Sequence, residues 1–282
     1  MASLENVRSH RAFGGEQAVY RHRSVSTGTA MEFAVFLPPQ VAQGPRPVLF
    51  YLSGLTCTWA NVTEKGGFQR SAAELGLIVV CPDTSPRGAD LPGENDAYDF
   101  GTGAGFYLDA TVTPWSRHYQ MATYIEEELP GLIEAHFPAD VSRIGLFGHS
   151  MGGHGALTIA LRNPDRYSSV SAFAPVVAPS QVPWGQKAFT GYFGHDPEAW
   201  RRHDACALVG HSRWRRPILM DQGSADEFLD IQLRPWLFSE ACAAAGVPLT
   251  VRMQPGYDHT YYFISTFMDD HLRHHAAAFG AR

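Results

Sequence analysis

The residue types and spacing with the clearest chemical meaning surround Ser150, which stands in the pattern Gly-x-Ser-x-Gly. Residues 143–147, just before it, are typical of a short buried strand, and residues 156–161 of the apolar start of a helix. A serine on such a strand-to-helix turn is a nucleophile elbow, whose flanking glycines permit a strained backbone. We therefore predict that Ser150 is a nucleophile. The backbone N–H of Met151, at the start of the helix, is expected to stabilise a developing oxyanion.

A serine hydroxyl needs a general base at neutral pH, and the base needs an acid to orient it. His259 follows the last predicted strand and precedes a helix, which is where the base is expected. The acid is expected after the preceding strand, at 218–220. Three acids are available there: Asp221, Asp226 and Glu227. Asp226 is preferred because it lies on the far side of the loop, whereas Asp221 is still at the strand end.

The other histidines have simpler interpretations. His149 and His154 are too close to Ser150 in sequence to act as its base, and we expect them to pack around the turn. Three more lie in the predicted last helix: His271, His274 and His275. We expect a solvated face there. A metal pair at His271 and His275 is the alternative, but no carboxylate stands at matching spacing, so no metal is predicted.

The second oxyanion donor is expected in the loop after the strand at 47–52. Gly54 allows a tight turn there, and the backbone N–H of Leu55 is the expected donor. Cys57 lies close by, either as a thiol at the site or as a small packing residue. A glycine-rich segment at 101–105 has the composition of a phosphate loop, but it does not join a clear strand to a helix.

Strand-like and helix-like stretches alternate along the chain and predict the elements that must position these residues. The expected strands are 33–37, 47–52, 77–81, 143–147, 168–173, 218–220 and 249–253. Helical stretches are expected at 69–75 and 116–135. This alternation predicts an α/β fold, a doubly wound and mostly parallel sheet with helices on both faces, in a single domain over residues 1–282. The stretches 83–114 and 175–216 are expected to lie over the carboxyl edge of the sheet.

Composition excludes several classes of function. The chain has 282 residues, 45% of them hydrophobic, and a net charge of −6, so it lacks the basic surface of a nucleic-acid-binding protein. No apolar run has the length of a membrane span, and the first residues do not resemble a secretory signal. The four cysteines lack metal-ligand spacing and are typical of free thiols in a reducing compartment. These features predict a cytoplasmic enzyme.

Several long segments together closely resemble the S-formylglutathione hydrolases, esterase D-type carboxylesterases of the α/β-hydrolase fold. The segments that carry the resemblance are 52–58, 82–88, 99–107, 147–157, 171–175, 183–185 and 256–259. The likeness extends from about residue 15 to about residue 275. So many long segments in one order make the resemblance specific.

The resemblance implies a triad of Ser150, Asp226 and His259, with the Leu55 and Met151 backbones as the oxyanion hole. It implies hydrolysis of S-formylglutathione to formate and glutathione in formaldehyde detoxification, through a formyl-enzyme. A cytoplasmic, cofactor-free and dimeric enzyme is implied as well. A general short-chain carboxylesterase without glutathione preference is the alternative. An acyltransferase and a non-catalytic binding protein are further ones.

Three side chains are candidates for contacts with the substrate, beyond the triad: Cys57, Trp184 and Lys187. Lys187 lies in the stretch expected to overhang the site, and a cation beside an aromatic wall suits the carboxylates of glutathione. The alternative is that Lys187 is a solvated loop lysine. Trp59 departs from the polar residue expected after Thr58 and could narrow the entrance.

Overall fold

A nine-stranded sheet in the order β1-β2-β3-β5-β4-β6-β7-β8-β9 forms the centre of the protein. The computed structural model describes residues 4–280. The strands are β1 Glu5–Ala12, β2 Gly15–Arg23, β3 Ala30–Leu37, β4 Arg46–Leu52, β5 Ile78–Pro82, β6 Ala139–His149, β7 Tyr167–Phe173, β8 Ile218–Gly223 and β9 Leu249–Gln254. Six neighbouring strands are parallel, in the order β5-β4-β6-β7-β8-β9, and β3 pairs with β5 in the antiparallel sense. This mostly parallel sheet confirms the predicted fold class.

The parallel strands are nearly continuous apolar runs because both faces of the sheet are covered. Every residue of β5 is buried, and so are six of the seven residues of β4. All seven strands expected from the sequence are present, although β6 and β8 extend further than their apolar cores.

The strands expected from the sequence did not include an N-terminal hairpin, which is formed by β1 and β2. These strands pair in the antiparallel sense around a tight turn at Phe13 and Gly14, both with positive φ. β1 is an edge strand on which seven of eight residues are exposed. It therefore carries no alternation of apolar and polar residues, which is the signal by which a half-buried strand is recognised.

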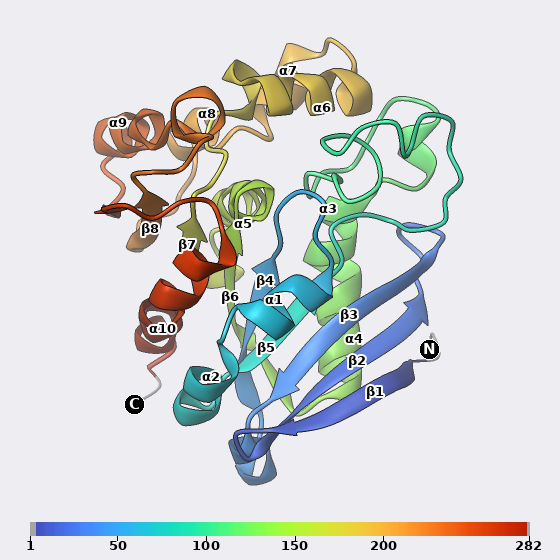
Figure 1. The fold of residues 1–282 in the computed structure, drawn as a ribbon, viewed down its shortest axis with the longest axis vertical. Helices are drawn as coiled ribbons and strands as arrows, with labels where there is room; N and C mark the ends of the chain where they lie inside the picture. Colours follow the sequence, from blue (N-terminus) through green and yellow to red (C-terminus); the bar gives the residue numbers. More distant parts are fainter. Residues whose placement is uncertain (1–3, 281–282) are drawn as a thin grey trace.

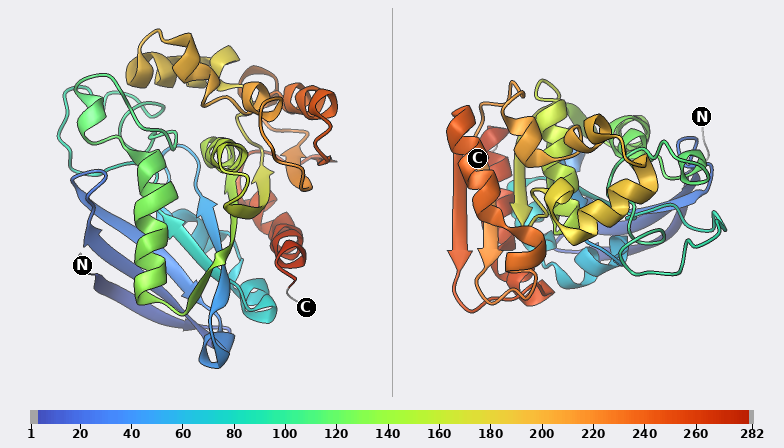
Figure 2. Two further views of the ribbon diagram at one scale, coloured as in Figure 1. Left: turned by 180° about the vertical axis from the view of Figure 1, so that it is seen from behind. Right: turned by 90° about the horizontal axis from the view of Figure 1, so that it is seen from above.

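Helices cover both faces of the sheet. They are α1 Trp59–Lys65, α2 Gln69–Leu75, α3 Met121–Thr123, α4 Leu129–His136, α5 Met151–Arg162, α6 Pro183–Phe193, α7 Pro197–Arg201, α8 Ala205–Val209, α9 Pro235–Ala245 and α10 Tyr261–Ala278. One face carries α1, α2 and α10, and the other carries α4 and α5, as the two opposite views show (Figures 1 and 2). A π-helical turn at 124–128 joins α3 to α4. No helix among residues 4–280 has the length and apolar character that a membrane span requires.

The candidate residues follow the carboxyl ends of the parallel strands, and two long connecting segments cover this edge of the sheet. These segments are residues 83–120 and the segment that contains α6 and α7 (Figure 1). This placement agrees with the expectation for 83–114 and 175–216.

A buried chain of hydrogen bonds fastens α10 to strands β7 and β8. Its contacts are Ser169 Oγ to His275 Nδ1 at 2.6 Å, Ser171 Oγ to His275 Nε2 at 2.9 Å and to His271 Nδ1 at 2.8 Å, and His271 Nε2 to Asp221 Oδ2 at 3.1 Å. One assignment of protons satisfies every contact: both imidazoles are neutral, each donates through Nε2–H, and each accepts a serine hydroxyl proton at Nδ1. Burial lowers the pKa of both histidines, which favours this neutral form.

Asp221 ends this chain and is neutralised from the other side by Arg252. The guanidinium donates to both carboxylate oxygens, from Nε at 2.7 Å and from Nη2 at 2.5 Å. Burial by itself would raise the pKa of Asp221, but hydrogen bonds from His271 and Arg252 outweigh it and lower that pKa to about 2. Asp221 is thus a structural carboxylate.

The expectation that His271, His274 and His275 form a solvated face was wrong. His271 and His275 are fully buried, and His274 is partly buried with Nε2 at 3.1 Å from the Val170 carbonyl. The spacing of these histidines in the sequence could not reveal their burial, because their hydrogen-bond partners are on β7 and β8. The two serine partners are about a hundred residues away along the chain.

We predict that Asp221→Asn lowers the free energy of unfolding by about 3 kcal/mol, since it leaves the Arg252 charge without its buried partner. Urea unfolding at pH 7 measures this. Arg213→Gln, which removes the fully solvated ion pair with Asp165, is the matched control and should leave the midpoint unchanged. Equal midpoints for both variants would contradict the structural role of Asp221.

The same network predicts loss of stability in acid, in two steps. The pKa values of His271 and His275 are lower in the folded protein than in the unfolded chain. As the pH falls below about 6.5, the unfolded chain therefore binds protons that the folded protein does not, and the free energy of unfolding declines. The contribution of Asp221 is complete above a pH of about 4 and is lost as the pH falls toward its folded pKa of about 2. Unfolding curves from pH 7 to 3 should show the first step reduced in His275→Gln.

Candidate active site

Ser150 occupies a strained turn between β6 and α5. Its backbone has φ 58° and ψ −119°, a conformation that side-chain-bearing residues rarely adopt. The turn is held by the Ser150 N–H, which donates to the Phe173 carbonyl at 2.9 Å, and by the Ser150 carbonyl, which accepts from the N–H of His154 at 3.0 Å. The structure thus contains the sharp turn that the pattern predicts.

The glycines of the pattern are required by contact as well as by conformation. A Cβ on Gly148 would lie 2.5 Å from the Gly152 backbone, and a Cβ on Gly152 would lie 1.9 Å from the Leu52 carbonyl oxygen. Both glycines have ordinary φ, so space and not φ excludes a side chain. The first turn of α5 therefore packs directly on the end of β4.

His259 and Asp226 meet at the carboxyl ends of adjacent strands. The His259 Nδ1 lies 2.6 Å from Asp226 Oδ2, and the carboxylate is buried. Asp226 also accepts the Phe228 N–H at 2.9 Å and the Gln222 side-chain amide at 3.1 Å. These bonds fix the carboxylate, and a carboxylate on Nδ1 directs the unprotonated Nε2 of His259 away from it.

The imidazole of His259 is held between two rings. His149 lies on one side with a centroid distance of 4.3 Å, and Phe228 meets it edge-on at 5.1 Å. Burial, and then the charge that His259 can carry, lower the pKa of His149 well below its usual value. His149 is therefore a neutral packing partner of the candidate base. His154 is also buried, with Nε2 3.2 Å from the Phe106 carbonyl, so both histidines pack around the turn as expected.

The loop after β4 places the Leu55 N–H beside this turn. A Cβ on Gly54 would lie 3.2 Å from Ser150 Cβ, so the two loops touch. Thr56 has a positive φ of 66°, and its N–H donates to the Gly103 carbonyl at 2.9 Å. The glycine-rich segment at 101–105 therefore supports this turn. Within residues 4–280, the N–H groups of Leu55 and Met151 donate to no protein acceptor.

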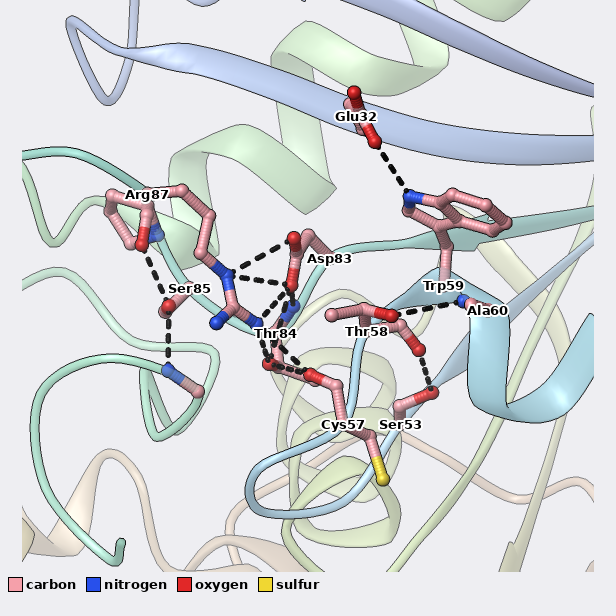
Figure 3. A network of polar contacts seen from close by, with 12 residues as sticks. Glu32, Ser53, Cys57, Thr58, Trp59, Ala60, Asp83, Thr84, Ser85 and Arg87 are labelled. Carbon is pink, nitrogen blue, oxygen red and sulfur yellow. Dashed lines mark hydrogen bonds and ion pairs between the residues drawn. The ribbon is translucent and has the colours of Figure 1, made fainter. Parts of the chain in front are cut away.

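A network centred on Arg87 holds the same loop from behind (Figure 3). The guanidinium binds Asp83 with Nη2 at 2.6 Å from Oδ1, and the same nitrogen donates to the Cys57 carbonyl at 3.1 Å. Thr84 also donates to that carbonyl. The segment at 82–88, which the resemblance singles out, thus fixes the backbone that carries Leu55.

A cavity of about 800 Å³ opens over Ser150 and His259. Its volume suits a ligand of drug or peptide size. Cys57 and Trp184, two of the candidate substrate contacts, line it. Burial raises the pKa of the Cys57 thiol, so the neutral thiol is favoured. The Trp184 indole donates to Tyr98 Oη at 3.0 Å and packs against Phe228 at a centroid distance of 4.6 Å.

Two other sequence-selected residues are not brought to the cavity. The Trp59 indole donates to Glu32 at 3.1 Å (Figure 3). Arg8 lies over the ring of Trp59, and Trp59 does not line the cavity. Lys187 forms an ion pair with Asp99 and does not line the cavity, so its assignment to glutathione binding is corrected.

Sequence reasoning did not select several residues that line the cavity, among them Lys65, Tyr98, Phe228 and Tyr262. Lys65 ends α1, a helix that starts directly after the Leu55 turn and that was not among the helices expected from the sequence. Tyr98 and Phe228 belong to irregular segments, whose paths the sequence did not predict, and Tyr262 lies in the first turn of α10. Among residues 4–280, no group of three or more His, Cys, Asp or Glu side chains is arranged to hold a metal ion.

Comparisons with known proteins agree with this geometry. A family model described as a putative esterase matches residues 24–274. The S-formylglutathione hydrolase of Mus musculus is 54% identical over 276 residues, covering 97% of this chain and 98% of that protein. The enzyme of the same name from Paracoccus denitrificans is 51% identical and covers 99% of both chains. A solved S-formylglutathione hydrolase structure from Agrobacterium tumefaciens superposes with a TM-score of 0.95 at 58% identity, covering 97% and 99% of the two chains.

The fold and the serine, histidine and aspartate at one sheet edge define an esterase of the α/β-hydrolase class. Within this esterase family, the chain belongs to the S-formylglutathione hydrolases. It is therefore a hydrolase, as the sequence predicted.

The packing of Gly152 generates a prediction about the Ser150 turn. Gly152→Ala should push α5 from β4, destabilise the fold by about 2–3 kcal/mol and lower esterase kcat about 100-fold by displacing the nucleophile. Gly131→Ala is the matched control, because Gly131 lies inside α4 with open space around it. That control should gain about 0.5–1 kcal/mol and keep its activity. Thermal unfolding and ester hydrolysis measure both effects, and an active, stable Gly152→Ala would contradict the packing argument.

Proposed function

We propose that this chain hydrolyses S-formylglutathione to formate and glutathione, with Ser150, His259 and Asp226 as a catalytic triad. The observation that carries the proposal is the 2.6 Å contact of His259 Nδ1 with the buried Asp226, in a cavity that also exposes Ser150. The identity of more than half of all residues with S-formylglutathione hydrolases over nearly full length supports the choice of substrate.

In the first half of the reaction, His259 Nε2 takes the proton of Ser150 as the hydroxyl oxygen attacks the formyl carbon. The resulting oxyanion accepts hydrogen bonds from the Leu55 and Met151 N–H groups, which have no other acceptor among the described residues. The C–S bond then breaks, and the imidazolium gives its proton to the departing glutathione thiolate. Ser150 is left as a formyl ester.

In the second half, His259 takes a proton from water, whose oxygen attacks the formyl ester. The same two N–H groups bind the second oxyanion. Collapse releases formic acid, which ionises to formate in solution, and His259 returns its proton to Ser150. Asp226 stabilises the imidazolium in both halves and stays ionised.

The triad is tested by replacing its members one at a time. Ser150→Ala should retain less than about 10⁻³ of wild-type kcat, and Asp226→Asn should lose roughly 10³–10⁴-fold because His259 loses its orienting acceptor. Glu227→Gln is the matched control, since Glu227 is the adjacent acid and its side chain is exposed. It should keep activity within about twofold. Retention of a sizeable fraction of activity in Ser150→Ala would refute the mechanism.

Substrate preference is tested by comparing kcat/KM for S-formylglutathione, S-acetylglutathione and p-nitrophenyl acetate. The proposal requires S-formylglutathione to be the best of the three substrates. A preference for the simple ester would instead support a general short-chain carboxylesterase. A burst of p-nitrophenolate on mixing with the ester would report the acyl-enzyme.

Three further proposals concern the whole molecule. We propose that residues 1–282 form a single domain, that the enzyme is a homodimer and that it is cytoplasmic. One continuous sheet from β1 to β9 supports the first, the family resemblance supports the second, and four unpaired cysteine thiols support the third. Light scattering and fractionation of cells test the assembly and the location.

A further inference from the structure

The cavity has an uneven distribution of charge. Among the described residues that line it, Lys65 is the one side chain of the types Lys, Arg, Asp or Glu. The remaining lining is aromatic, neutral polar or backbone, apart from the candidate base His259. A ligand that fills the cavity therefore meets one permanent positive charge and no permanent negative charge.

Lys65 is held at a defined place by the loop that carries the candidate oxyanion donor. It is the last residue of α1, which starts directly after that loop. Thr58 caps α1: its Oγ1 accepts the Ala60 N–H at 3.1 Å, and the Asn61 side chain accepts the Thr58 N–H at 2.9 Å. The stem of the lysine thus starts from a fixed helix next to the site.

The Lys65 ammonium has no anionic partner within 4.0 Å among residues 4–280, whereas Lys187 is paired with Asp99. Its side chain is exposed at the cavity wall. An ammonium without a partner can bind a ligand carboxylate without first breaking a protein ion pair.

The neighbouring start of α10 does not compete for the same role. α1 and α10 are in contact, and Thr260, Tyr262 and Ser265 of the α10 end also line the cavity. Two N–H groups of this helix end already have acceptors: Asp258 Oδ1 accepts from Thr260 N–H at 3.0 Å, and Thr260 Oγ1 accepts from Tyr262 N–H at 3.3 Å. A helix end also supplies only a partial charge, so the full positive charge on this side of the cavity is that of Lys65.

The thiol that leaves in the proposed reaction matches this charge. At neutral pH glutathione carries a glycyl carboxylate, a glutamyl carboxylate and one ammonium group, so its net charge is negative. A simple ester such as p-nitrophenyl acetate carries no charge. Only the glutathione thioester can therefore gain from Lys65.

We infer that Lys65 binds a carboxylate of the glutathione moiety and determines the preference for glutathione thioesters over neutral esters. The inference rests on the proposed function, because the glutathione thioester is the substrate assumed there. It replaces Lys187 with the other lysine of the chain, which contains only these two. The contact acts on binding, so it should affect KM more than kcat.

The first test measures the ratio of kcat/KM for S-formylglutathione to that for p-nitrophenyl acetate. The ratio should fall about tenfold in Lys65→Gln, fall further in Lys65→Glu and be largely restored in Lys65→Arg, which keeps the charge. Lys187→Gln is the matched control and should keep the wild-type ratio. An unchanged ratio in Lys65→Gln would overturn the inference, and so would an equal fall in both lysine variants.

Esterified glutathione distinguishes the two carboxylates. If Lys65 binds the glycyl carboxylate, blocking it as the ethyl ester should remove the difference between wild type and Lys65→Gln. If Lys65 binds the glutamyl carboxylate, the difference should persist with this substrate. Either outcome supports a carboxylate contact, provided that the unblocked thioester shows the difference.

The second test does not depend on catalysis. Amine-directed acylation followed by mass spectrometry reports Lys65 and Lys187 separately. S-methylglutathione, a thioether that cannot be hydrolysed, should slow the modification of Lys65 and leave that of Lys187 unchanged. Equal rates at Lys65 with and without S-methylglutathione would overturn the inference. Failure of the wild-type enzyme to cleave S-formylglutathione would instead refute the proposed function, which this labelling experiment distinguishes.

Discussion

The strained backbone at Ser150 is the constraint on which the rest of the site depends. A φ of 58° for a serine costs roughly 1–3 kcal/mol and persists only if the surroundings over-determine it. Here the contact of Gly152 with the end of β4, and the bond from Ser150 N–H to the Phe173 carbonyl of β7, supply that support. Because β4, β6 and β7 are neighbours in one buried parallel sheet, the turn cannot relax without separating strands. The backbone of Ser150 is therefore fixed by the core of the sheet.

The parallel sheet also explains why distant residues meet. The loops that carry Leu55, Ser150, Asp226 and His259 follow β4, β6, β8 and β9, and the carboxyl ends of parallel strands share one edge. β4 lies next to β6 and β8 lies next to β9, so Leu55 and Ser150 follow one neighbouring pair of strands, and Asp226 and His259 follow another. The buried chain from Ser169 to Asp221 fastens α10 across β7 and β8, next to the loops of the second pair.

The sequence predicted those features that depend on local pattern and chain order. The seven core strands have local signals and are present. The order Ser150, Asp226, His259 after β6, β8 and β9 has local signals as well, and in it His259 contacts Asp226. Features set by long-range packing were not predictable in this way. β1 is exposed on seven of its eight residues, so it has no apolar pattern. His271 and His275 have the spacing of a helix face, and only the fold shows that β7 and β8 cover that face. Lys187 was preferred to Lys65 because proximity to Trp184 in sequence was taken for proximity to the cavity.

The two aspartates near the end of β8 show how the same residue type acquires different roles a few positions apart. Asp221 is still paired within the sheet, opposite Arg252 of β9, and its oxygens are occupied by Arg252, Gln254 and His271. It has no free acceptor to offer a base at the sheet edge. Asp226 lies beyond the strand, where Oδ1 accepts the Phe228 N–H and Oδ2 accepts the Gln222 amide and also contacts His259 Nδ1. In the sequence, the two aspartates differ in their position relative to the end of β8. The physical reason why this position matters is that hydrogen bonds from β9 and α10 occupy both carboxylate oxygens of Asp221.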